Sequence, residues 1–284
     1  MRRQPFRSVL AALLLLGFPA QAEQTCKLCA EYEIEIDIWH QGRIEKLKGE
    51  NGWLSLAGLY WLKPGENRFG SDPKSDIRFP ARAPKYLGSI TLRGKTATLS
   101  MAGKKKVLKP GTDKITAGEF TFLVIERGGR LALRLFDRKA KTLLDFKGIE
   151  RFPARLRWKK FARFEAYPKP KKVAVTTVIR TTEEVLVPGE VVFLHDGKEY
   201  RLIPTGQSET GELFFAFTDE TNGDETYSGG RFMYTPAPRD GRVELDFNRS
   251  YNPPCSFTPY ATCPVPRKEN RLPFRVEAGE KKPR

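Results

Sequence analysis

The sequence predicts an all-β protein, a mainly antiparallel sandwich or barrel, with one amphipathic helix near the N-terminus. Turn-forming pairs recur along the chain, such as GG at 128–129 and DG at 196–197 and 240–241. The runs between turns, including FTFLVIE, LALRLF and EVVFLH, are rich in β-branched and aromatic residues. Short strands of this composition between turns are typical of sandwiches and barrels rather than of α/β enzymes.

The segment 31–48 contains two competing periodicities. The letters EIEIDI alternate as in a strand, but Tyr32, Ile36, Trp39 and Leu47 fit a three-to-four spacing over a longer window. Acidic residues gather at the front of the segment and basic residues at its back, just before a glycine, which suits the helix dipole and a helix end. We therefore predict an N-terminal segment at 23–49 that contains one amphipathic helix.

Residues 1–22 resemble a secretory signal peptide. Three arginines precede an apolar stretch with four consecutive leucines, and the letters AQA at 20–22 form a small-x-small cleavage site. The apolar stretch is shorter than the roughly 20 residues that a membrane-spanning helix needs. We expect cleavage after Ala22, a periplasmic or secreted protein, and no transmembrane segment.

The chain is strongly basic, with a formal net charge of +16 at pH 7. A polyanion partner, such as an acidic polymer of the cell envelope, is one interpretation. The lysines and arginines are scattered, however, and no basic–aromatic recognition motif is present, so nucleic acid is not an expected partner.

Four cysteines occur in two pairs, Cys26/Cys29 and Cys255/Cys263. Disulfides are the default in an exported protein, and three pairings are possible. A redox-active pair or a metal site remains an alternative for the CxxC, although no strand precedes it. The C-terminal pair encloses a short proline-rich loop, which a disulfide would stiffen further.

The organisation predicted for the rest of the chain is two β-rich halves, at 50–167 and 168–284. The letters YPKPKK at 167–172 mark the best internal linker, because two prolines do not fit a central strand. The second half ends in the proline-rich loop, which we expect disulfides to hold.

Polar residues gather in two segments of the second half, 219–231 and 246–263. Asn-Gly at 222–223 is a favoured hairpin turn, and the spacing of the surrounding oxygen ligands does not fit a helical calcium loop. We predict no metal and no cofactor. The candidate ligand-binding residues are Asp219, Asn222, Asp224, Tyr227, Arg231, Asp246, Asn248, Tyr251 and Asn252.

Three long blocks, "TDETNGDETYSGGRF" (218–232), "LDFNRSYNPPCSFTPYATCP" (245–264) and "ENRLPFRVEAGEK" (269–281), resemble the bacterial and archaeal family called domain of unknown function 1684. Residues 52–80 carry a further block of this resemblance, which implies a β-rich protein and no known activity. Within that block, "GENRFGSDPKSDIRFP" is similar to the start of forkhead-associated domains, which implies a β-sandwich at 50–167. Ser71 stands where those domains carry a phosphate-contacting arginine, so phosphopeptide binding does not carry over.

The leading hypothesis is an exported binding protein with its site between 219–231 and 246–263. Arg231 would anchor an anionic group of a small ligand, because its planar fork binds two oxygens. The alternative is a hydrolase-type enzyme on the same patch, with Asp246 or Asp219 as general base and Tyr251 or His195 as acid. A further alternative is an envelope structural protein that binds acidic polymers.

Overall fold

The computed structural model describes residues 18–283; residues 1–17, most of the predicted signal peptide, lie outside this range. The predicted fold class is confirmed, because antiparallel sheets dominate the molecule and one long helix precedes them. None of the described helices is both long and apolar enough to cross a membrane.

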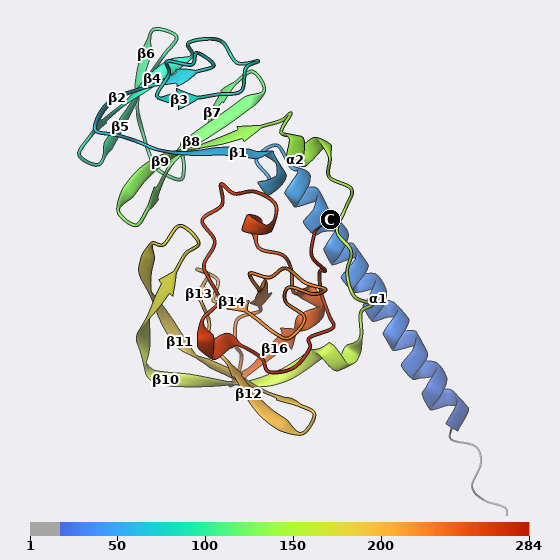
Figure 1. The fold of residues 1–284 in the computed structure, drawn as a ribbon. Helices are drawn as coiled ribbons and strands as arrows, with labels where there is room; N and C mark the ends of the chain where they lie inside the picture. Colours follow the sequence, from blue (N-terminus) through green and yellow to red (C-terminus); the bar gives the residue numbers. More distant parts are fainter. Residues whose placement is uncertain (1–17, 284) are drawn as a thin grey trace, which may run out of the picture.

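The long helix, α1 (Phe18–Lys48), ends one residue before Gly49, where the sequence predicts a helix stop. Ile36 is fully buried, whereas Ile38 is 69% exposed. The three-to-four spacing thus describes this segment, and the alternation of EIEIDI does not. In Figure 1, α1 runs along one side of the C-terminal half and reaches the N-terminal half with its last turns.

The structure describes Cys29, Cys255 and Cys263 as free thiols, so disulfides stay a prediction. Cys29 lies in α1 with its side chain exposed to solvent on the helix, whereas Cys263 is buried in the second half of the chain. Of the three possible pairings, the structure shows neither of the two that would join Cys29 to the proline-rich loop. The side chain of Cys26, the other expected partner of Cys29, lies outside the part of the chain that the structure describes.

The first half of the chain forms two sheets that face each other. One sheet has the strand order β1-β9-β8-β7 and the other the order β3-β2-β4-β5-β6. Their shared core contains a cluster of phenylalanine rings, with Phe69 and Phe122 centroids 5.1 Å apart. The strands are β1 (Leu56–Trp61), β2 (Gly65–Gly70), β3 (Ile77–Arg78), β4 (Gly88–Arg93), β5 (Thr96–Met101), β6 (Lys104–Leu108), β7 (Ile115–Ala117), β8 (Phe120–Arg127) and β9 (Arg130–Asp137).

The second half also contains two sheets, with the orders β12-β11-β10-β16 and β13-β14-β15. Its core gathers aromatic and aliphatic side chains from both sheets and from the C-terminal segment around Phe247. The strands are β10 (Lys159–Thr176), β11 (Thr182–His195), β12 (Lys198–Leu202), β13 (Gly206–Gln207), β14 (Leu213–Phe217), β15 (Arg231–Thr235) and β16 (Arg242–Asp246). The short helix α2 (Lys141–Leu144) lies between the halves along the chain.

The expected linker at 167–172 lies inside β10 instead. The pairing of β10 with β11 shifts between Ala166 and Lys171, so both prolines sit in an irregular stretch of the strand. Proline is tolerated at such a bulge because no ladder hydrogen bond is required of it there. The similarity of the first half to forkhead-associated domains stays a prediction.

The two halves meet around Trp53, which lies in the single-turn helix η1 (Trp53–Ser55). Its ring packs against apolar groups of the outer face of the β1-β9-β8-β7 sheet and against the cluster that contains Cys263. The Thr258 hydroxyl donates to the Leu56 carbonyl at 3.0 Å across the same junction. The proline-rich loop is therefore wedged between the halves, and these contacts hold it without a disulfide.

Candidate functional site

The two predicted polar segments do lie side by side. The backbones of Phe232 and Tyr251 exchange two hydrogen bonds of 2.9 Å, and the Tyr227 hydroxyl lies 3.5 Å from the Cys255 carbonyl oxygen. β14 and β15 form an antiparallel hairpin, and residues 218–230 are its loop. The candidate residues, however, divide into several separate groups.

The first group is a buried ion pair in the hairpin loop. The side chains of Asp219 and Arg231 have no exposed surface, and a 2.7 Å contact joins Asp219 Oδ2 to Arg231. The Arg231 guanidinium also donates to the backbone carbonyls of Val276 and Ala278. Burial lowers the pKa of Arg231, with the Asp219 charge opposing that shift. Arg231 therefore links the hairpin to the C-terminal segment and presents no surface to a ligand from solvent.

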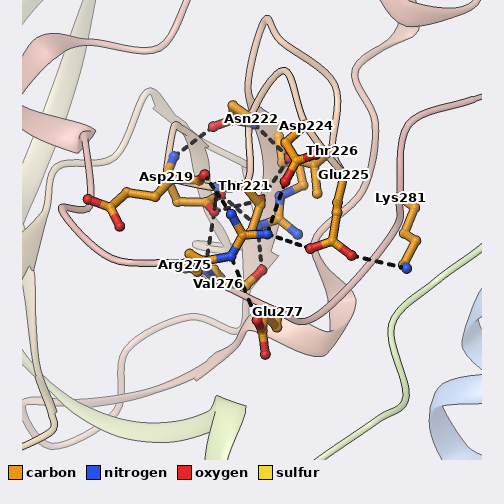
Figure 2. A network of polar contacts seen from close by, with 12 residues as sticks. Asp219, Thr221, Asn222, Asp224, Glu225, Thr226, Arg275, Val276, Glu277 and Lys281 are labelled. Carbon is orange, nitrogen blue, oxygen red and sulfur yellow. Dashed lines mark hydrogen bonds and ion pairs between the residues drawn. The ribbon is translucent and has the colours of Figure 1, made fainter.

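Figure 2 shows how the rest of the loop folds around Asp219. Its Oδ1 atom accepts from the amide and hydroxyl of Thr221, at 2.9 and 2.6 Å, and from the amide of Val276 at 3.1 Å. The Asn222 side chain closes the loop by donating to the Tyr227 carbonyl at 2.8 Å. Asp224 lies at the exposed rim, 3.3 Å from the Arg275 guanidinium. The polar groups of the loop thus form hydrogen bonds with one another and with the C-terminal segment, and these contacts stabilise the turn.

The second group joins α1 to the end of β16. The Tyr32 hydroxyl lies 2.8 Å from both carboxylate oxygens of Asp246, and the Asn248 amide donates to the Tyr32 oxygen at 2.9 Å. Asn248 also bridges the backbone N–H and C=O of Arg155. Burial raises the pKa of the Asp246 carboxyl, although the hydrogen bonds from Tyr32 and Asn248 act in the opposite direction. Burial likewise raises the pKa of Tyr32.

The third group surrounds Glu280, which is fully buried near the end of the described chain. Its carboxylate accepts from Arg43 Nε at 3.0 Å and from the backbone N–H of Asn252 at 2.7 Å. The Arg43 guanidinium also donates to the Asn252 carbonyl and lies 4.2 Å from the centre of the Tyr251 ring. His40 Nε2 is 3.7 Å from Glu280, and burial lowers the pKa of His40. This cluster fixes the C-terminal part of α1 to the C-terminal segment of the chain.

A cavity of about 230 Å³ lies where α1 passes over β15 and β16. Of the nine candidate residues, Asp246 and Tyr251 line it. Trp39 of α1 and Tyr234 of β15 supply further aromatic surface, and the rings of Tyr234 and Tyr251 are nearly parallel, 6.5 Å apart. The cavity therefore collects aromatic side chains from three parts of the chain.

The polar lining of this cavity is mainly acidic. Glu212, Glu244 and Asp246 contribute carboxylates, of which Glu244 is paired with Lys159 at 3.1 Å, and Arg249 contributes one guanidinium. Arg249 already forms ion pairs with Asp246 at 3.4 Å and with Glu35 of α1. The acidic character stands out in a chain with a net charge of +16. Carboxylates beside aromatic faces suit hydrogen-bond donors and cationic groups.

His195 lies away from this cavity. Its ring is stacked between Trp158 and Phe274, at centroid distances of 5.1 and 4.1 Å. Burial lowers the pKa of His195, which favours a neutral ring in this aromatic stack. The proposed pairing of His195 with Asp246 as acid and base is thus not assembled in the structure.

Sequence reasoning missed the part that α1 plays in the site. Tyr32 and Trp39 each lie about one helical turn from the buried Ile36, and their periodicity shows only that they share a face. Tyr234 and Glu244 belong to ordinary alternating strands. Nothing in the local pattern of these residues distinguishes a cavity lining from a solvated sheet face.

A larger cavity of about 770 Å³ lies elsewhere, beside α2 and the proline-rich loop. Leu54, Phe146 and Phe257 line it together with Lys141 and Lys147. None of the nine candidate residues contributes to it. Among the side chains the structure describes, no cluster of three or more His, Cys, Asp or Glu residues is arranged to hold a metal ion.

Comparison with known proteins finds a family match in the second half of the chain. Residues 144–281 match the model of the family described as "Protein of unknown function (DUF1684)", so the N-terminal block at 52–80 lies outside the match. The chain is similar to an uncharacterized protein of Haloarcula marismortui solved by solution NMR. The two share 29% identity over 48% of this chain and 77% of that chain, with a TM-score of 0.41. No curated protein matches the chain. Residues 144–281, which carry β10 to β16 and most of the acidic cavity, belong to the DUF1684 family.

Proposed function

We propose that this chain is an exported protein that binds a small ligand in the cavity between α1, β15 and β16. The observation that supports this proposal is the convergence of Trp39, Tyr234 and Tyr251 with the carboxyl group of Asp246 around one hollow. Small-molecule sites combine apolar and aromatic walls with a few fixed polar groups. Here the hydrogen bonds of Asp246 to α1 fix the polar group in place.

The ligand that suits this cavity carries a positive charge or several hydrogen-bond donors. Glu212, Glu244 and Asp246 present acceptors, and an amine beside an aromatic face gains cation–π attraction. An anionic ligand would meet the Glu212 carboxylate, which forms no ion pair with a described side chain, whereas the Arg249 guanidinium is already paired with Asp246 and Glu35. The cavity volume of about 230 Å³ limits the ligand to a small molecule.

One observation favours an enzyme as the second candidate. Asp246 lines the cavity, and burial raises the pKa of its carboxyl. A carboxyl group of raised pKa in a cavity is suited to proton transfer. Tyr251, rather than His195, is the candidate acid that shares this cavity.

The proposal includes export, with cleavage after Ala22 and later oxidation of Cys255 and Cys263 to a disulfide. Each α1 side-chain contact described above begins at Tyr32 or later, so cleavage would leave it in place. The structure holds Cys255 and Cys263 as thiols, with the Cys255 amide 3.2 Å from Cys263 Sγ. The hydrogen bond from Cys263 lowers the pKa of Cys255 to about 7. That proximity and the thiolate it favours support oxidation in an oxidising compartment, and Cys29 takes no part in it.

A thermal-shift titration with small primary amines tests the binding function, with acetate as the anionic probe and monosaccharides as neutral donors. We expect an amine to stabilise the wild-type protein and acetate to have no specific effect. Trp39→Ala should remove the amine-dependent stabilisation, while Ile38→Ala, at the adjacent exposed position, should keep it. Equal responses of both variants, or no response of the wild-type protein to any probe, would refute the proposal.

A hydrolysis assay on the wild-type protein and the Asp246→Asn variant distinguishes an enzyme from a binding protein. Asp246→Asn should abolish hydrolysis of a responsive substrate if the carboxyl group transfers a proton. If the protein only binds, this variant should weaken amine binding and no hydrolysis should be seen in either protein. The acidic-polymer alternative predicts instead that envelope association falls at raised salt, irrespective of Asp246.

A further inference from the structure

We propose that the junction between the two halves holds a separate binding site for a small oxyanion, such as phosphate or sulfate, formed by Arg127, Arg134 and Thr262. Arg134 Nη2 and Arg127 Nε both approach the Thr262 hydroxyl oxygen, at 3.5 and 3.2 Å. Two guanidinium groups therefore converge on one hydroxyl of the proline-rich loop.

The strand register places both arginines on the same face of the sheet. β8 and β9 pair with Leu123 opposite Arg134 and with Arg127 opposite Arg130. Leu123, Ile125 and Arg127 alternate along β8, so they point to the side away from the phenylalanine core. That outer face is covered by the proline-rich loop, which brings Thr262 over it.

The Arg134 side chain is buried without a counter-charge. The residue is 8% exposed, its Nε atom is buried with no hydrogen-bond partner, and its guanidinium lies 5.3 Å from the centre of the Trp53 ring. Among the side chains that the structure describes, no carboxylate forms an ion pair with Arg127 or Arg134. Burial and the neighbouring Arg127 charge lower the pKa of Arg134 to about 10.

Arg231 provides an internal contrast. That buried guanidinium has a carboxylate at 2.7 Å and two backbone carbonyls as acceptors. Proteins pair buried charges in this way because an unpaired buried charge is strongly destabilising. An unpaired buried arginine beside a second arginine is the arrangement that a bound anion would neutralise.

A cavity of about 360 Å³ opens onto the two arginines and is lined by Arg127, Arg134 and the turn at 110–111, while Thr262 contacts both arginines without lining it. Arginine forks bind phosphate and sulfate oxygens through paired N–H donors, and the Thr262 hydroxyl can donate to a further oxygen. Glu126 also lines the cavity, but its carboxylate is paired with Lys95 at 3.2 Å. The two arginines thus outweigh the acid at this site.

Thr262 lies inside the loop that Cys255 and Cys263 enclose, and its neighbour Cys263 packs in the cluster that includes Trp53. The loop therefore positions the hydroxyl group over the two arginines. This position gives the stiff proline-rich segment a role that is independent of the acidic cavity near α1.

Isothermal titration calorimetry with inorganic phosphate, at constant ionic strength in chloride, tests this site. The wild-type protein should bind phosphate, and Arg134→Met should weaken binding by about tenfold or more, since charge-assisted hydrogen bonds are lost. Arg93→Met, an exposed arginine on β4, is the matched control and should leave the affinity unchanged. Sulfate and acetate in place of phosphate distinguish a tetrahedral oxyanion from a carboxylate.

The melting temperature without phosphate provides a second, independent readout. Removing an unpaired buried charge should leave it unchanged or raise it in Arg134→Met, while the phosphate-dependent rise should disappear. If Arg134→Met fails to fold, Thr262→Val takes its place, with a smaller loss of affinity expected. Absence of phosphate and sulfate binding by the wild-type protein, whether or not acetate binds, or equal affinity in the Arg134 and Arg93 variants, would overturn the proposal.

Discussion

The buried pair of Asp219 and Arg231 makes a sharp prediction about stability. Asp219→Asn keeps the side-chain shape and one oxygen acceptor but removes the charge that faces Arg231 at 2.7 Å. The guanidinium then has no counter-charge and keeps only the carbonyls of Val276 and Ala278 as acceptors; breaking a buried ion pair in this way typically costs about 3–5 kcal/mol. For a protein of this size, that loss corresponds to a fall in melting temperature of about 6–20 °C.

Arg231→Met has a different cost. The apolar side chain fills a similar volume, but the carbonyls of Val276 and Ala278 lose their donor. The Asp219 carboxylate keeps the donors from Thr221 and Val276, so its charge is only partly uncompensated. We expect a loss of about 3–5 kcal/mol here too.

The double variant isolates the interaction between the two charges. With both groups neutral, no uncompensated charge remains, so the double variant should lose clearly less stability than the sum of the single variants, by about 2 kcal/mol or more. Urea unfolding followed by tryptophan fluorescence and by circular dichroism measures all four proteins. Additive effects, or single variants that each cost below about 1 kcal/mol, would refute the structural role of the pair.

Three further predictions concern other parts of the chain. Ile36→Ala should cost about 2–4 kcal/mol of unfolding free energy, while Ile38→Ala, on the exposed face of α1, should change it by less than about 0.5 kcal/mol; comparable losses would contradict the docking of α1. Burial raises the pKa of Asp246 above 3.8, so its contribution to stability is complete below pH 3.8 and is lost as pH rises through the folded-state pKa. Asp246→Asn should therefore gain stability relative to wild type as pH rises above 3.8, and parallel pH profiles would contradict this. In protein isolated from the exporting cell, a thiol-alkylating reagent should label Cys255 and Cys263 only after a reductant has been added. Labelling without reductant would contradict the proposed disulfide.

The sequence predicts the local structure well where contacts between neighbouring residues determine it. The spacing of Tyr32, Ile36 and Leu47 identifies α1 and its buried face, and Gly49 marks its end. The Asn-Gly turn at 222–223 falls in the loop of the β14–β15 hairpin. These features depend on neighbouring residues, so they can be read without the rest of the fold.

The site depends on contacts between distant residues, which no local pattern encodes. Tyr32 meets Asp246 across 214 positions of sequence, and Arg43 meets Glu280 across 237. Arg231 is of the residue type expected for an anionic ligand, but it is buried against Asp219 and therefore has a structural role. A polar residue that satisfies a buried loop and one that faces a ligand have the same appearance in sequence.

The cysteines show that composition and compartment do not determine pairing. The count of four cysteines suggested disulfides throughout, yet Cys29 is an exposed thiol on α1 while Cys255 and Cys263 lie close together. The direction in which α1 turns the Cys29 side chain separates these cases, and that direction depends on how the helix docks. The spacing of cysteines along the chain carries no such information.

The prolines at 168 and 170 show the same limit for domain organisation. Their chemistry excludes a regular central strand but allows either a linker or a bulge. The pairing of β10 with β11 shows that the prolines lie in a bulge, because the register shifts between Ala166 and Lys171. Only the partner strand distinguishes these two outcomes.

Native mass spectrometry of the protein isolated from the cells that produce it tests the ligand-binding claim most directly. We predict that part of the wild-type protein carries a small bound molecule, which Trp39→Ala protein prepared in the same way has lost. Wild-type and Trp39→Ala protein that both have the bare mass of the chain, or that retain the same adduct, would contradict ligand binding in the cavity between α1, β15 and β16.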